Sequence, residues 1–260
     1  MESFKYGDKL DQFVDIYKYF DNQPIILIIH GGYWKQKYTK TLNDSMINFF
    51  LDKKINVLSI EYRRGANKWP IPVKDVETCI KKLLSKKIIK DEYFIIIGHS
   101  VGGQIALLLN QYSDITIALA PVTDVVYTEK MKLGENIVPV YFNVLSNLAL
   151  HLASPIYQKS LKLNKLLLIH GLNDKDVHIK SSNRFVQKFK GSQICYWKYK
   201  NLEHLECIEN YELFENIYKY INNSLKITRD KDAHLLNRIE QYRYQQFCYT
   251  KPCVNGGYKM

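Results

Sequence analysis

The sequence predicts an α/β domain with a mostly parallel central sheet, helices on both faces of the sheet and a small lid. Short, continuous apolar runs such as residues 25–29 and 93–97 are typical of strands that are buried on both faces. Longer segments between them, such as residues 72–87, carry apolar residues at helical spacing. Strands that alternate with helices along the chain pair in parallel, with helices on both faces.

The expected elements follow this alternation in order. Residues 12–17 alternate enough for an early strand, and the further strands are expected over 25–29, 55–62, 93–97, 115–120, 166–169 and 194–199. Helices are expected over 39–53, 72–87, from about 101, 181–190 and 209–224.

Two segments depart from the alternation. Residues 122–160 form an insertion that is apolar but irregular from 138 to 152, and we expect either a small lid or a single packing helix. The main domain then spans residues 1–227, and residues 228–260 form a C-terminal extension. The extension has a weak amphipathic helix followed by coil over 250–257, which could pack on the domain, contact a partner or be partly disordered.

Length and composition limit the function classes. The 260 residues are 46% hydrophobic and 24% charged, as in a single large globular domain. The net charge is +11, but the lysines are scattered and no basic strip with interleaved aromatics occurs, so no nucleic-acid partner is expected. Biased composition explains the charge better than an anionic partner does.

Cysteine usage and hydropathy bear on location. The five cysteines show neither paired spacing nor a metal-binding pattern, which favours reduced thiols in a cytoplasmic protein without a metal site. The first residues lack the basic and apolar regions of a signal peptide, and no apolar run approaches a membrane span.

The stretch Gly98-His99-Ser100-Val101-Gly102 organises the chain chemically. It has the pattern G-x-S-x-G between an apolar strand and an apolar helix, where a tight turn exposes a serine hydroxyl at the carboxyl end of a strand. The backbone N–H of Val101 then lies at a helix N-terminus and can stabilise an oxyanion. The alternative is a glycine-rich helix entry with Ser100 as its capping residue.

A second glycine-rich turn follows the strand at 25–29. In the run His30-Gly31-Gly32-Tyr33-Trp34, the glycines let the backbone approach a ligand closely, so Gly32 or Tyr33 is expected to give the second oxyanion donor. An ordinary strand-to-helix turn is the alternative.

A nucleophilic serine needs a base and a carboxylate that orients the base. In a fold of this type they follow the serine in the order acid, then histidine, each after a strand. Asp174 and Asp176 lie in the loop after residues 166–169, and we prefer Asp174 as the acid. His204 follows the last strand and is the expected base. The other histidines, including His99, are expected to be structural. This chemistry requires no cofactor and no metal.

At these residues the chain resembles the α/β-hydrolase superfamily, more narrowly its kynurenine formamidase-like and carboxylesterase-like group. The matching segments are H-G-G-Y-W at 30–34, E-Y-R-R at 61–64, W-P at 69–70, G-H-S-V-G-G at 98–103 and H-G-x-x-D-x-x-V at 170–177. The sequence departs from that group at Val101, where alanine is usual, and at His178, where proline is usual. Glu203 also replaces the more usual glycine or aspartate before the histidine.

The resemblance implies hydrolysis of a small-molecule ester or aryl-formamide, such as N-formylkynurenine. Tyr33 and Trp34 would then line a substrate pocket, although either could equally belong to the core. Two other functions stay open. The triad could serve acyl or thioester transfer in a biosynthetic pathway, or the chain could be a non-catalytic binding protein on a hydrolase scaffold. The sequence does not indicate an oligomeric state.

Overall fold

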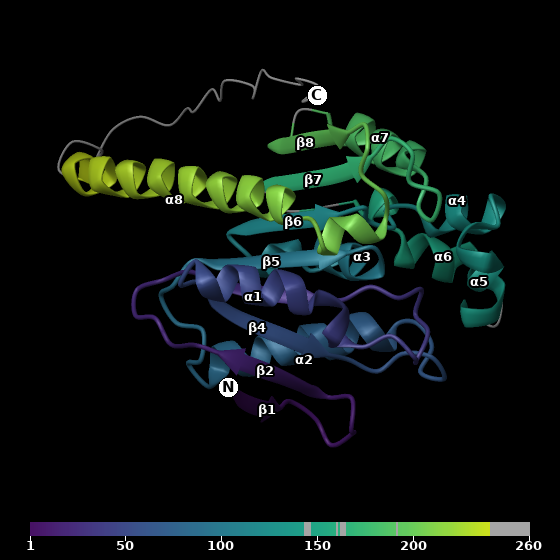
Figure 1. The fold of residues 1–260 in the computed structure, drawn as a ribbon, viewed down its shortest axis with the longest axis horizontal. Coiled ribbons are helices and arrows are strands. Elements are labelled where there is room, and N and C mark those ends of the chain that lie inside the picture. The colour runs from purple at the N-terminus through teal and green to yellow at the C-terminus, as the bar shows by residue number, and fades with distance from the viewer. Residues whose placement is uncertain (143–146, 160, 162–164, 191, 240–260) are drawn as a thin grey trace.

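The computed structural model describes residues 1–142, 147–159, 161, 165–190 and 192–239 (Figure 1). Eight strands in this part of the chain form one sheet with the order β1-β2-β4-β3-β5-β6-β7-β8. Strands β1 and β2 are antiparallel to their neighbours, and β4, β3, β5, β6, β7 and β8 run parallel. The strands are β1 (Glu2–Lys5), β2 (Phe13–Tyr17), β3 (Ile25–Ile29), β4 (Asn56–Glu61), β5 (Phe94–His99), β6 (Ile115–Leu119), β7 (Leu166–Gly171) and β8 (Ile194–Tyr199).

Helices cover both faces of this sheet, as side-chain alternation along the strands requires. Ile26 and Ile28 of β3 pack toward α1 (Asp44–Asp52), which follows the short 3-10 helix η1 (Lys40–Asn43), and toward α8 (Tyr211–Ile239). Leu27 points to the opposite face, where α2 (Ile71–Ser85) and α3 (Val101–Leu108) lie. Helix α7 (Ile179–Lys188) lies on the same face as α3. In Figure 1, α1 and α8 are in front of the sheet and α3 is behind it.

The predicted α/β-hydrolase fold is therefore confirmed, and the predicted ends of most elements differ from the observed ones by only one to three residues. Strand β1 was not predicted. It is an edge strand whose residues are mostly exposed, so the sequence contains no apolar run there.

The insertion between β6 and β7 consists of several short elements in its described part. These are α4 (Val125–Lys130), α5 (Leu133–Phe142), α6 (Asn147–Ala153) and the 3-10 turn η3 (Pro155–Tyr157). They lie together at the end of the sheet to which the β7 arrow points in Figure 1. A single packing helix is therefore the wrong alternative. The chain adopts positive φ angles at Gly134, Glu135 and Asn136, and Pro155 follows α6, so one continuous helix cannot form.

Helix α8 continues through the boundary expected between residues 227 and 228 and ends at Ile239. Its described buried apolar side chains are Leu213, Phe214, Ile217, Ile221 and Leu225. The coil predicted over 250–257 lies outside the described residues.

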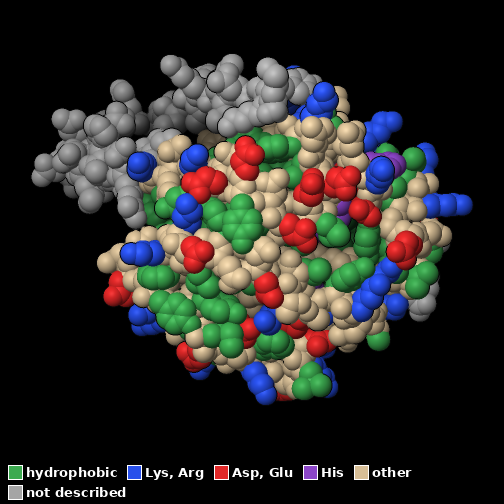
Figure 2. Space-filling view, viewed as in Figure 1, with side chains coloured by type: hydrophobic (Ala, Val, Ile, Leu, Met, Phe, Trp, Pro, Cys, Tyr) green, Lys and Arg blue, Asp and Glu red, His purple; other side chains and the backbone are tan. Residues whose placement is uncertain are grey.

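Two surface properties bear on partners. Across the described ranges, no helix combines the length and the apolar character needed to cross a lipid bilayer. On the face shown in Figure 2, lysine and arginine side chains are interspersed with aspartate and glutamate side chains.

Candidate active site

Ser100 lies in the tight turn between β5 and α3. Its backbone has φ 57° and ψ −116°, a conformation that is costly for a residue with a side chain. The turn is held by the N–H of Ser100, which donates to the carbonyl of Leu119, and by the carbonyl of Ser100, which accepts from Val122. The strained turn predicted from G-x-S-x-G is thus present, with Ser100 at the carboxyl end of the central strand β5.

The glycines of the motif are needed for steric reasons. A Cβ atom on Gly98 would lie 2.1 Å from the carbonyl oxygen of Gly102, and one on Gly102 would lie 2.1 Å from the carbonyl oxygen of Ile29. Both neighbours are backbone atoms that cannot rotate away. These contacts bring α3 close enough to β3 for Ser100 to lie beside the loop that follows β3.

Asp174 lies in the loop after β7, and this loop directs both of its oxygens. Oδ1 accepts the N–H groups of Asp176 and Val177, each at 2.9 Å, and Oδ2 lies 2.8 Å from Nδ1 of His204. Burial raises the pKa of Asp174, but hydrogen bonds from His170 and His204 lower it more, so the pKa is below its usual value. An ionised carboxylate only accepts hydrogen bonds, so Nδ1 of His204 carries the proton and Nε2 is left to accept one.

Asp176, the less favoured acid, has a different environment. It is exposed, and its Oδ1 accepts a hydrogen bond of 2.8 Å from the hydroxyl of Tyr33. Asp174, Asp176 and His204 are the one group in the described part of the chain whose ligand atoms, within 4.8 Å of one another, could hold a metal ion. Within this group, Asp174 shares a hydrogen bond with His204, and the Asp176 side chain accepts one from Tyr33. The structure therefore supports Asp174 as the partner of His204.

His99 packs against His204, the expected base, and contacts its backbone. Its Nε2 lies 2.9 Å from the backbone carbonyl of His204, and the two rings are 4.6 Å apart. Burial, reinforced by the charge of His204, holds the pKa of His99 well below its usual value. A neutral His99 with its proton on Nε2 can donate to that carbonyl and fix the position of the base. The structural role expected for His99 fits this geometry.

Ser100 and His204 are close to the same loops, but their side chains are not joined. Ser100 is 1% exposed, and its Oγ has no hydrogen-bond partner among the described residues. Catalytic hydrogen bonds are often long in unliganded enzymes and shorten when substrate binds. The structure thus brings Asp174 and His204 into contact and leaves the Ser100 hydroxyl free.

The loop after β3 passes next to Ser100. A Cβ atom on Gly31 would lie 3.0 Å from Cβ of Ser100. Gly32 has φ 115°, and the N–H groups of Gly32, Tyr33 and Val101 have no acceptor in the described part of the chain. Free N–H groups beside a serine hydroxyl are the requirement for an oxyanion hole.

The two aromatic residues of this loop have different environments. Tyr33 is half-buried, and the centre of its ring lies 6.4 Å from the centre of the His204 ring. A Cβ atom on Gly134 would clash with the Tyr33 ring. Trp34 is 1% exposed and stacks on Tyr141 at 5.2 Å within the core. The core alternative is therefore favoured for Trp34, and Tyr33 is the aromatic side chain beside His204.

Two charged residues near the site received no role from sequence. Glu61 and Arg64 are 4% and 1% exposed, at the end of β4 and just after it. Nη1 of Arg64 donates to Oε1 of Glu61, and the same Oε1 lies 3.1 Å from Nε2 of His30. The signal was present in the E-Y-R-R segment, but its partners in space are not adjacent in sequence.

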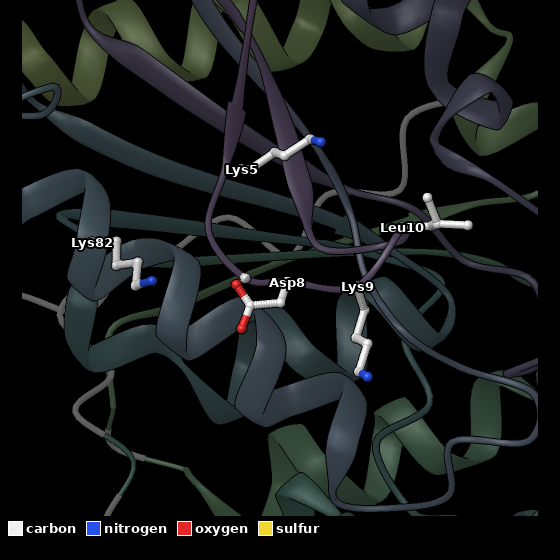
Figure 3. Close-up of a pocket in the computed structure, with 6 residues that line it drawn as sticks. Lys5, Asp8, Lys9, Leu10 and Lys82 are labelled. Carbon is white, nitrogen blue, oxygen red and sulfur yellow. The ribbon is translucent and has the colours of Figure 1, made fainter.

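A cavity of about 410 Å³ lies beside the β1–β2 turn (Figure 3). Its lining is almost entirely exposed and consists of Lys5, Gly7, Asp8, Lys9, Leu10 and Lys82. It shares no residue with the candidate active site.

Solved structures similar to this chain include several esterases at low sequence identity. Esterase B from Lactobacillus rhamnosis has a TM-score of 0.74 and 15% identity, covering 91% of this chain and 88% of that one. An acetyl ester-xyloside bifunctional hydrolase from Caldicellulosiruptor lactoaceticus has a TM-score of 0.72 and 15% identity, covering 85% and 96%. Esterase 2 from Thermogutta terrifontis, phosphonylated by sarin, has a TM-score of 0.69 and 16% identity, covering 85% and 93%. At these identities the likeness establishes the fold.

Comparison at the sequence level gives two results. A search of curated protein sequences found no match. The model of the prolyl oligopeptidase family matches residues 61–228, which include Ser100, Asp174 and His204 and amount to more than half of the chain. This chain therefore belongs to the prolyl oligopeptidase family of α/β hydrolases.

Proposed function

We propose that this protein is a serine hydrolase that cleaves a small ester or an aryl-formamide through Ser100, His204 and Asp174. The observation that carries the proposal is the 2.8 Å contact between Nδ1 of His204 and Oδ2 of Asp174, at the same end of the sheet as the strained turn at Ser100. The esterases with similar folds, one of them phosphonylated by sarin, support this class of chemistry.

The first half of the reaction forms an acyl-enzyme. Nε2 of His204 takes the hydroxyl proton of Ser100 as Oγ attacks the substrate carbonyl. The N–H groups of Val101 and of Gly32 or Tyr33 stabilise the resulting oxyanion. His204 then gives its proton to the leaving alcohol or amine, and the C–O or C–N bond breaks.

The second half regenerates the enzyme. His204 removes a proton from water, the hydroxide attacks the acyl-enzyme, and the acid leaves as Ser100 regains its proton. Asp174 stays ionised and stabilises the imidazolium that forms in both halves.

The narrower substrate class rests on the resemblance to the kynurenine formamidase-like group and on Tyr33. The ring of Tyr33 lies beside His204, where the leaving group departs, and could stack on an aryl leaving group. We assign catalysis to residues 1–227, a covering role to the insertion at 122–160, and no catalytic role to the extension at 228–260.

The test combines fluorophosphonate labelling with hydrolysis of p-nitrophenyl acetate, longer acyl esters and N-formylkynurenine. Wild type should be labelled and active, and Ser100→Ala should lose labelling and more than about 10⁴-fold in kcat. Preference for N-formylkynurenine would support the formamidase subclass, and ester turnover alone would favour a carboxylesterase. Acyl transfer to an added alcohol or thiol in excess of hydrolysis would favour a transferase. Absence of both labelling and turnover would overturn the proposal.

A further inference from the structure

His30, the residue before the glycine pair, has a hydrogen-bond acceptor at each ring nitrogen. Its Nδ1 lies 2.7 Å from the carbonyl oxygen of Gly31, and its Nε2 lies 3.1 Å from Oε1 of Glu61. The ring is fully buried and stacks on Tyr62 at 4.4 Å, and the Tyr62 hydroxyl donates to the carbonyl of His30.

The acceptor at Nε2 is a carboxylate. Burial raises the pKa of Glu61, but the hydrogen bond from His30 and the positive charges of His30 and Arg64 lower it more, so Glu61 is ionised. A carbonyl and a carboxylate cannot donate, so both contacts are attractive only when His30 carries a proton on each nitrogen. A neutral imidazole would turn a lone pair toward one of the two acceptors. The other charged or titratable groups nearest this ring are Arg64, Tyr62 and, across Gly31, His99.

The bond from His30 to Gly31 has a consequence on the far side of the same peptide. In a trans peptide the C=O and the following N–H point in opposite directions, so fixing the carbonyl of Gly31 also fixes the N–H of Gly32. Gly31 lies against Ser100, and the Gly32 N–H has no acceptor within the described residues. The hydrogen bond between His30 and the Gly31 carbonyl therefore directs the Gly32 N–H away from His30, toward the side where a substrate carbonyl would lie.

Glu61 also holds the other end of this loop. Its Oε2 accepts the backbone N–H of Lys40 at 3.1 Å. Arg64, which it pairs with, donates to the carbonyls of Gln36 and Tyr38 at 3.2 Å and 2.7 Å. One buried carboxylate thus connects the beginning of the loop, its end and the arginine that holds its middle.

We propose that Glu61 and His30 are positioning residues for the oxyanion hole: Glu61 accepts a hydrogen bond from Nε2 of His30, and Nδ1 of His30 donates to Gly31 and so sets the plane of the Gly31–Gly32 peptide. Neither side chain needs to touch the substrate. This inference rests on the proposed function, because the Gly32 N–H matters to rate only if Ser100 attacks a carbonyl.

The first experiment compares Glu61→Gln with Asp75→Asn. Asp75 is a matched control, because it is also a buried carboxylate paired with an arginine, Arg63. In the described structure it accepts its hydrogen bonds from Arg63 and Gln12 and none from His30. For E61Q we expect kcat on p-nitrophenyl acetate to fall about tenfold to a hundredfold, with KM changed less than about threefold, because a misaligned donor weakens oxyanion stabilisation only. D75N should lower the melting temperature and leave kcat within about twofold. Equal kcat in the two variants would overturn the proposal.

The second experiment separates the two bonds of His30. Asn at position 30 can place its amide N–H near the site of Nδ1 and donate to the carbonyl of Gly31. Gln is longer, so its amide N–H can donate to Glu61 in place of Nε2. We expect H30N to keep more of kcat than H30Q, and E61Q to cost little more in the H30N background. A purely structural role predicts the reverse order, because Gln preserves the contact with the buried Glu61.

The third measurement does not depend on activity. ¹⁵N spectra of the imidazole rings at pH 7, assigned with H30Q, should show protons on both nitrogens of His30 in wild type and on one nitrogen in E61Q. A neutral His30 in wild type would overturn the inference even in an active enzyme. A doubly protonated His30 in a protein without hydrolase activity would instead retain the protonation result and reject the proposed function.

Discussion

Nδ1 of His204 lies 2.8 Å from Oδ2 of Asp174, although the two residues are 30 positions apart in the chain. The contact exists because β7 and β8 are parallel neighbours and both residues follow the carboxyl ends of these strands. It fixes which ring nitrogen of the base is protonated, and that makes the contact testable separately from the nucleophile.

Asp174→Asn should lower kcat by about 10⁴-fold, the size of the effect when the triad aspartate of trypsin is replaced by asparagine, because the base then adopts the wrong tautomer. The measurement is steady-state hydrolysis of p-nitrophenyl acetate. Asp176→Asn is the control and should change kcat less than about tenfold, since Asp176 contacts Tyr33 and not Nδ1. If the two variants exchange these effects, Asp176 is the acid.

The same carboxylate predicts how stability depends on pH. The folded state lowers the pKa of Asp174, so its contribution to stability is complete above the unfolded value of about 3.9 and is lost as the pH falls toward the folded value. The free energy of unfolding, from urea denaturation, should therefore decrease from about pH 5 downward. D174N should show a shallower decrease than wild type between pH 5 and pH 3, and identical slopes would contradict the assignment.

Tyr33 can be divided into its hydroxyl and its ring. Tyr33→Phe removes the hydrogen bond to Asp176, which is exposed and can bind water instead, so kcat/KM should fall less than about fivefold, or about 1 kcal/mol. Tyr33→Ala also removes the ring beside His204 and Gly134. If this ring binds an aryl leaving group, Y33A should raise KM for N-formylkynurenine more than KM for esters of aliphatic alcohols. Equal changes in the two KM values would assign the ring a packing role.

The turn at Ser100 should not tolerate a methyl group at Gly98. Gly98→Ala would place Cβ 2.1 Å from a backbone oxygen, and we expect a loss of about 3 kcal/mol or more in unfolding free energy, or failure to fold. The control is Gly7→Ala, whose Cβ would meet only the end of the flexible Gln12 side chain and should cost less than about 1 kcal/mol. Chemical denaturation of both variants measures the difference, and a G98A protein as stable as G7A would refute the steric argument.

Deletion of residues 228–260 tests the domain boundary. The last buried side chain described in α8 is Leu225, so the shortened protein keeps the described contacts of this helix with the sheet. We expect kcat/KM within about threefold of wild type and a melting temperature lower by a few degrees. Loss of folding or of activity would place the extension within the catalytic unit.

Strand β3 could be predicted because it is buried on both faces and leaves a continuous apolar run, and the partly buried edge strand β8 because its run is rich in aromatic and apolar residues. Residues 25–29 and 194–199 were predicted with the ends that the structure has. The insertion was harder, because three consecutive residues from Gly134 have positive φ and interrupt the helical spacing. Propensity and period describe regular backbone only.

The partners of charged residues were harder still. Ser100, Asp174 and His204 could be proposed from a motif and from chain order, since each follows a strand. Nothing in the local pattern indicates that Glu61 faces His30, because that contact depends on how β4 pairs with β3. For the same reason, Trp34 could not be assigned to the core before its stacking on Tyr141 was known.

The way Arg64 holds the loop after β3 has a practical consequence for protein engineering. Arg64 donates to the backbone carbonyls of Gln36 and Tyr38. Every amino acid has a backbone carbonyl, so these two bonds do not depend on which side chain is present at either position. The side chains at positions 35–37 take no part in these two bonds, although Lys35 pairs with Glu135 and Gln36 donates to Asp11 at the surface. A combinatorial library at these three positions would alter the surface near Tyr33 without changing Ser100, Asp174 or His204, which makes this short segment the place to begin directed evolution of leaving-group preference.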